Sequence, residues 1–106
     1  MKAARIGLFM AYESINPVLQ EWANRRRIVI LREDGSDRPF FYISSASAET
    51  FQVVIEPEQD GVVRIDAHLI ETSNDEEVHY IWQVQVENLL RLLNLSIRAA
   101  ELWFKR

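Results

Sequence analysis

The residues best suited to bind a metal ion are Asp66, His68 and His79. Asp66 and His68 are two positions apart and therefore share one face of a predicted strand, while strand pairing places His79 opposite His68. Two imidazoles and a carboxylate are suitable ligands for zinc or iron. Because any polar sheet face collects such residues by chance, we interpret them as a solvated cross-strand cluster. We expect neither a metal ion nor a cofactor.

Other residues of catalytic type lack the neighbours that their chemistry requires. Ser44, Ser45 and Ser47 could include a nucleophile, but no G-x-S-x-G turn surrounds them. The three glycines are isolated at positions 7, 35 and 61, so no glycine-rich phosphate loop is present, and no acidic loop has EF-hand spacing. No pair of carboxylates is singled out for acid–base work. The sequence therefore predicts a protein that is not an enzyme.

The charge of the chain argues against nucleic acid as a partner. With 12 Lys and Arg against 16 Asp and Glu, the net charge is −4, whereas nucleic-acid binders usually carry a basic face. Acidic side chains gather in three predicted loops, over residues 33–37, 56–60 and 71–77. Such loops either keep the protein soluble or steer a basic partner toward it.

The chain has no cysteine, which excludes disulfides and suits a reducing compartment. Lys2 and Arg5 precede an apolar run of only six residues, at positions 6–11, with no small-residue cleavage site after it. That run is also too short to span a membrane. We expect one soluble cytoplasmic domain, residues 1–106, without a membrane partner.

Period-two hydrophobicity predicts five strands, over residues 28–33, 40–44, 51–56, 62–70 and 78–86. Turns are expected at Asp34-Gly35, at 57–61 and at 71–77. Asn16 as a cap and Pro17 in the first turn predict a short helix that ends near Arg25. Residues 1–12 are compatible with helix or strand and favour helix slightly.

Side-chain alternation also predicts strand register. Pairing positions whose numbers sum to 147 sets Val63 opposite Val84, and pairing positions that sum to 118 sets Ile55 opposite Val63. Every pair on that face is then apolar, as one buried face requires. A slip of one residue would set Ile55 against Arg64. The opposite face is polar with a few aliphatic residues, so we expect it to be wet or half covered by a partner.

The last twenty residues predict an amphipathic helix with an unusually wide apolar surface. Its polar residues recur every three or four positions and fall on one narrow stripe: Glu87, Arg91, Asn94, Arg98, Glu101 and Lys105. The remaining apolar arc spans about 240°, whereas an ordinary surface helix needs little more than about 100°. We expect this helix to cross the apolar sheet face, with Ser96 at the closest approach. The predicted fold is α+β, an antiparallel sheet of about five strands covered on one face by this helix and by the short N-terminal helix.

Size, acidity and the lack of a catalytic motif favour a protein-binding module that masks a partner. A bacterial immunity or antitoxin-type inhibitor of a basic toxin would have these traits. The expected contacts are acidic loop residues and a second patch on the polar sheet face: Glu58, Asp60, Asp75, Glu76 and Glu77, then Arg64, Asp66, Gln83 and Gln85. One alternative is a homodimeric structural or chaperone-like module that associates through the C-terminal helix. Another is a small metal-binding or enzymatic domain that uses His68 and His79.

Overall fold

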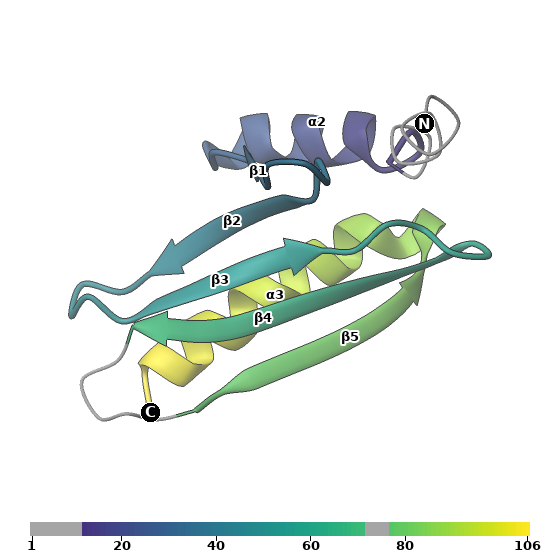
Figure 1. Cartoon of the computed structure of the whole chain (residues 1–106). Coiled ribbons are helices and arrows are strands. Elements are labelled where there is room, and N and C mark those ends of the chain that lie inside the picture. Colours follow the sequence, from purple (N-terminus) through teal and green to yellow (C-terminus); the bar gives the residue numbers. More distant parts are fainter. Residues whose placement is uncertain (1–11, 72–76) are drawn as a thin grey trace.

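The computed structural model of the chain describes residues 12–71 and 77–106, with the side chain of Glu71 outside the description. It confirms the predicted α+β class, with all five strands antiparallel in the order β1-β2-β3-β4-β5 (Figure 1). The elements are α2 (Asn16–Arg26), β1 (Leu31–Arg32), β2 (Pro39–Ser44), β3 (Thr50–Ile55), β4 (Val62–Glu71), β5 (His79–Gln85), the 3-10 turn η1 (Val86–Asn88) and α3 (Leu89–Phe104). The choice between helix and strand for residues 1–12 falls almost entirely outside the described residues.

Helix α2 forms where it was expected, but Asn16 does not cap it. Ile15 occupies the N-cap position, and no side chain caps the helix. The preceding turn already satisfies the first amides, because the carbonyl of Tyr12 accepts hydrogen bonds from the backbone N–H groups of Ile15 and Asn16. The side-chain oxygen of Asn16 instead accepts a hydrogen bond of 3.0 Å from Arg32. At the C-terminal end of α2, Arg27 has a left-handed backbone conformation with φ of 58°.

The strand predicted over residues 28–33 is mostly wrong, since β1 contains two residues. The chain leaving α2 is still held to the helix, because the amide of Ile28 donates to the carbonyl of Ala23 at 2.9 Å. At the far end β1 meets Pro39, which has no amide to donate. This edge of the sheet is therefore short.

The predicted register between β4 and β5 is confirmed. Val63 lies opposite Val84, and Ile65 lies opposite Trp82. Ladder hydrogen bonding continues one position beyond β5, where the amide of Leu69 donates to the carbonyl of Val78 at 2.9 Å. These apolar pairs form the buried face that the alternation predicted.

The predicted register between β3 and β4 is wrong by two residues, because Ile55 pairs with Ile65 and not with Val63. Gln59 and Val62 exchange two backbone hydrogen bonds of 2.9 Å, so the turn contains only Asp60 and Gly61. Both turn residues have positive φ, 53° and 79°, as a type I′ hairpin requires. A shift of two positions leaves every side chain on its predicted face.

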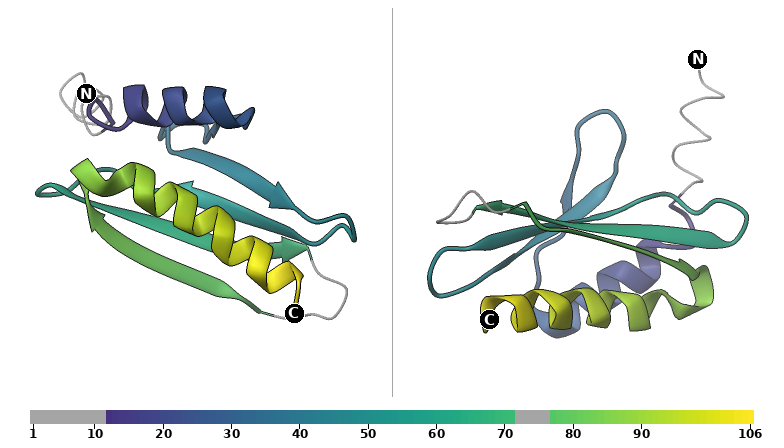
Figure 2. Two further views of the ribbon diagram at one scale, coloured as in Figure 1. Left: turned by 180° about the vertical axis from the view of Figure 1, so that it is seen from behind. Right: turned by 90° about the horizontal axis from the view of Figure 1, so that it is seen from below.

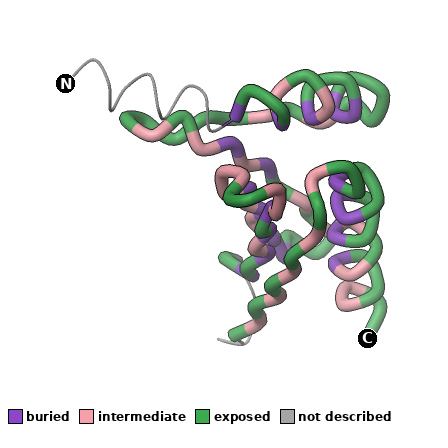
Figure 3. The backbone as a smooth tube through the Cα atoms, turned by 90° about the vertical axis from the view of Figure 1, so that its right-hand side faces the viewer, coloured by how far each residue is buried: buried purple, intermediate pink, exposed green. Residues whose placement is uncertain are grey.

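Both helices pack on the same side of the sheet (Figures 2 and 3). The buried side of α3 contains Leu89, Leu92, Leu93, Ser96 and Ala100. Ser96 is fully buried, as expected from its place in the apolar arc. The wide apolar arc of α3 is not covered over its whole width within the part of the chain that is described, because three leucines remain exposed: Leu90, Leu95 and Leu102.

Candidate protein-binding surface

The side of the sheet that faces away from α2 and α3 is not covered by any described element (Figure 2). We call it the outer face. Strand alternation and the pairing register place these residues on it: Phe40, Tyr42, Gln52, Val54, Glu56, Arg64, Asp66, His68, Ile70, His79, Ile81, Gln83 and Gln85.

The outer face carries exposed apolar side chains on three strands, β2, β4 and β5. Tyr42 is 46% exposed and Ile81 is 51% exposed, with Ile70 close behind at 43%. The ring of Phe40 packs edge-on against that of Tyr42, with centroids 5.8 Å apart. Val54 pairs with Phe40, so it extends the same apolar strip toward β4. Phe40, Tyr42 and Val54 thus form one apolar strip, and Asp66 separates it from Ile81. Exposed apolar groups that gather beside polar neighbours are typical of binding surfaces.

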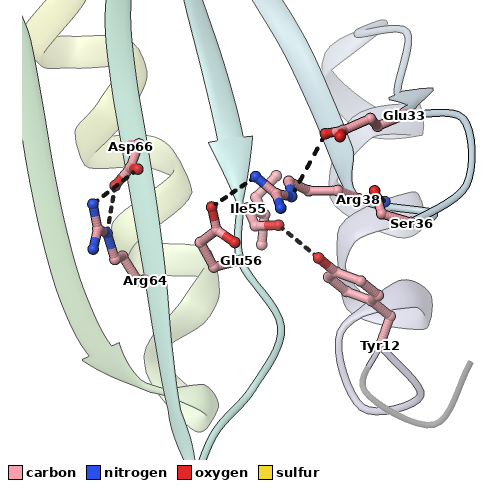
Figure 4. Close-up of polar contacts among 8 residues, drawn as sticks. All are labelled: Tyr12, Glu33, Ser36, Arg38, Ile55, Glu56, Arg64 and Asp66. Carbon is pink, nitrogen blue, oxygen red and sulfur yellow. Dashed lines mark hydrogen bonds and ion pairs between the residues drawn. The ribbon is translucent and has the colours of Figure 1, made fainter. Parts of the chain in front are cut away.

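The cations beside this strip are already neutralised by neighbouring acids (Figure 4). Arg64 and Asp66 share one strand face and form a two-pronged ion pair, Nε to Oδ1 at 2.8 Å and Nη2 to Oδ2 at 3.1 Å. Hydrogen bonding to Asp66 raises the pKa of Arg64. Arg38 contacts Glu56 at 3.3 Å and Glu33 at 3.6 Å. A partner would therefore meet few uncompensated positive charges here.

The predicted polar patch is partly assembled. Arg64 and Gln83 are register partners, and both line a hollow of about 470 Å³ together with Glu56, Pro57, Gln59 and Val62. Gln85 lies opposite Val62 at the same end of the sheet. Asp66 lies opposite Ile81, nearer the apolar strip.

Of the acidic loop residues expected as contacts, those that the structure describes lie near opposite ends of β4. Asp60 lies in the β3–β4 turn, and Glu58 beside it accepts a hydrogen bond of 2.5 Å from Ser14. Glu77 precedes β5 at the opposite end of β4, and the ten residues of β4 span about 33 Å. Asp75 and Glu76 lie outside the described residues.

Sequence reasoning missed two contributors to the outer face. The first is the pair Phe40 and Tyr42, although the alternation within residues 39–44 was the signal that places them there. The second is the β1–β2 turn, residues 33–38, which projects on the side opposite the helices (Figure 2, right). It carries Glu33, Asp34 and Asp37, which belong to a predicted acidic loop but are not among the predicted contacts.

His68 and His79 lie opposite each other as expected, with ring centroids 5.3 Å apart. Within residues 12–71 and 77–106, no three His, Asp or Glu side chains come close enough to hold a metal ion together. Two of the serines considered as nucleophiles bond each other: the hydroxyl groups of Ser45 and Ser47 lie 3.0 Å apart, and that of Ser45 also accepts a hydrogen bond from the amide of Glu49.

Charge is divided between the two layers. Residues 28–86, which include all five strands, contain three Lys and Arg but twelve Asp and Glu, a net charge of −9. The helical segments 16–27 and 87–106 contain seven basic and three acidic residues, a net charge of +4. The sheet layer alone is therefore far more acidic than the whole-chain value of −4 suggests.

No protein-family model matches the chain, and no curated protein or solved structure matches it either. Among the described helices, none combines the length and the apolar character needed to cross a membrane.

Proposed function

We propose that this protein is a binding module whose outer face masks a basic surface of a partner protein. The observation that carries the proposal is an uncovered sheet face with an apolar strip, formed by Phe40, Tyr42 and Val54, in a layer of net charge −9. Apolar contact would provide the affinity, and the acidic turns would speed encounter with a basic protein. An immunity or antitoxin-type inhibitor of a basic toxin would act in this way.

The geometry supports masking by contact alone. Within the face, Asp66 neutralises Arg64 and Glu56 neutralises Arg38. A partner that covers these four residues would therefore bury no isolated charge from them. Four further acids lie on the rim, in the turns at residues 33–38 and 57–61: Asp34, Asp37, Glu58 and Asp60. A charged rim around an apolar centre is the usual arrangement of a protein interface.

A photo-crosslinking experiment tests this proposal. One sample carries the crosslinking amino acid in place of Tyr42 on the outer face, and the matched control carries it in place of Arg98 on the exposed stripe of α3. Both are incubated in lysate of the native host. We expect one basic protein to crosslink strongly from position 42 and weakly from position 98.

The identified protein is then titrated against purified variants by calorimetry. Tyr42→Lys should weaken binding at least tenfold, because it removes the aromatic ring from the apolar strip and sets a positive charge against the basic partner. Arg98→Ala should leave the affinity unchanged. An acidic partner, equal crosslinking from both positions, or full affinity of Tyr42→Lys would each contradict the proposal.

A further inference from the structure

Strand β5 is an exposed sheet edge without the features that usually prevent edge-to-edge association. It has seven residues in unbroken register with β4, and none of its side chains carries a fixed charge. It contains no proline and no bulge. The opposite edge, β1, is only two residues long and includes Arg32. Natural sheets normally shorten, charge or twist their edges, as this sheet does at β1.

The hydrogen-bond pattern identifies which backbone groups of β5 face outward. The amide of Leu69 bonds the carbonyl of Val78, and the amide of Val86 bonds the carbonyl of Gly61. In an antiparallel ladder such bonded positions alternate along the strand, so the even-numbered positions 78–86 face β4. The N–H and C=O groups of four residues therefore point away from the sheet: His79, Ile81, Gln83 and Gln85.

We propose that a second copy of this chain pairs with β5, antiparallel and about a twofold axis at Trp82. In that register Ile81 lies opposite Gln83 of the second copy, and His79 lies opposite Gln85 of the second copy. All four outward-facing residues then exchange hydrogen bonds across the axis, two for each pair. The two sheets become one continuous ten-stranded sheet.

The side chains of β5 fit a copy of themselves. On the helix side, the half-buried ring of Trp82 meets its symmetry mate, and Tyr80 lies opposite Val84 of the second copy. On the outer face the pairs are uncharged. An isologous contact requires a surface that is compatible with itself, and a strand without charged side chains brings no like charges together.

The exposed leucines of α3 provide a second contact for the same partner. Leu90 and Asn94 line the hollow between α3 and α2, and Leu95 lies about 140° around the helix from Leu90. Leu95, 46% exposed, and Leu102, 57% exposed, therefore lie on the flank of α3 that is turned away from α2. Strand β5 lies on that side of α3, opposite α2 (Figure 2, left). A twofold axis at Trp82 keeps both α3 helices on one side of the joined sheet with these flanks turned toward each other.

Light scattering coupled to size-exclusion chromatography tests the dimer with three purified proteins. The wild type should elute at twice the chain mass of 12.4 kDa over a concentration series. The double variant Ile81→Lys with Gln83→Lys sets lysine against lysine across the axis and should be a monomer. The matched variant Ile81→Lys with Gln83→Glu sets lysine against glutamate and should restore the dimer. Circular dichroism confirms that each protein is folded.

Amide hydrogen exchange of the wild type locates the interface. In the proposed dimer the amides of Ile81 and Gln83 are bonded across the axis and should exchange at least a hundredfold more slowly than in the lysine–lysine variant. The inference is overturned if the wild type remains a monomer at a protein concentration of roughly 0.1–1 mM. It is also overturned by a dimer in which these two amides exchange quickly, or by one that the lysine–lysine variant retains.

This inference does not depend on the proposed function. The dimer uses the edge of β5, whereas the basic partner is expected at Tyr42 on β2, and the charge variants at positions 81 and 83 leave that part of the sheet unchanged. If a strand of another protein occupies the edge, the pure protein is monomeric, which overturns the inference.

Discussion

The indole nitrogen of Trp22 on α2 donates a hydrogen bond of 2.9 Å to the side-chain oxygen of Asn94 on α3. Trp22 is 5% exposed, and its ring packs against Phe41 of β2 with centroids 5.3 Å apart. One side chain thus connects both helices to the sheet. Asn94 belongs to the polar stripe of α3, which places the acceptor at the boundary between the stripe and the core.

Replacing Asn94 by alanine should lower the free energy of unfolding by about 1–3 kcal/mol, because the buried indole N–H loses its acceptor. Asn94→Asp is the matched variant, since it retains an acceptor oxygen and should retain most of the stability. Urea denaturation followed by tryptophan fluorescence measures both. Equal stabilities of the alanine variant and the wild type would show that water replaces the acceptor at no cost.

A second stability prediction concerns Gly61 in the β3–β4 turn. Gly61 has φ of 79°, and a Cβ added there would meet Gln85 Oε1 at 3.6 Å, an ordinary contact. Gly61→Ala should therefore cost about 1–2 kcal/mol through backbone conformation and not through a clash. Asp60→Asn is the control, because asparagine tolerates the φ of 53° at that position. Thermal unfolding should rank the alanine variant clearly below the asparagine variant.

The β3–β4 turn also explains why the register of one strand pair was predicted correctly and that of the other was not. Between β4 and β5 the apolar pairs alone determine the pairing, and Val63 opposite Val84 was correct. Between β3 and β4, registers that differ by two residues both pair apolar side chains, so the pattern cannot separate them. The Asp60-Gly61 dipeptide contained the missing information, since a two-residue turn at that dipeptide requires the observed register.

The candidate surface was less predictable than the fold. Arg64 and Gln83 were placed together because they share a well-determined strand pair. The alternation of β2 places Phe40 and Tyr42 on the outer face, but only the register between β2 and β3 sets Val54 beside Phe40 and so assembles the apolar strip. The exposure of Leu95 and Leu102 depends on where α2 lies relative to α3, and the spacing of residues within α3 does not contain that information.

Ser96 gives a test of the packing between α3 and the sheet. It is fully buried, and its hydroxyl group donates to the carbonyl of Leu93 at 2.7 Å. Ser96→Ala should change stability by less than about 1 kcal/mol, because the hydroxyl bonds within its own helix. Ser96→Leu should cost about 1–3 kcal/mol by forcing α3 away from the strands. Chemical denaturation of both variants measures the difference, and a leucine variant as stable as wild type would show that space remains beneath the helix.

Tyr12 makes the stability of the protein depend on pH in the alkaline range. Its hydroxyl group donates a hydrogen bond of 3.2 Å to the carbonyl of Ile55, and its side chain is 3% exposed. Burial, with a smaller contribution from the charge of Glu56, raises the pKa of Tyr12 from 10.0 to about 12. The folded state therefore retains a proton that the unfolded state loses between pH 10 and 12.

The sign follows from this difference in bound protons. The contribution of Tyr12 is complete below pH 10 and is lost as the pH rises toward 12, with a total of up to about 3 kcal/mol. Tyr12→Phe removes the ionisation and also the hydrogen bond, which contributes about 1 kcal/mol. At pH 8 the wild type should therefore be more stable than the variant, and by about pH 11 that advantage should be gone. Urea denaturation of both proteins at pH 8, 9, 10 and 11 measures the difference in their free energies of unfolding. The other tyrosines and the lysines ionise in both proteins, so their contributions cancel in that difference. A constant difference over that range would mean that the phenol of Tyr12 ionises as easily in the folded protein as in the unfolded chain.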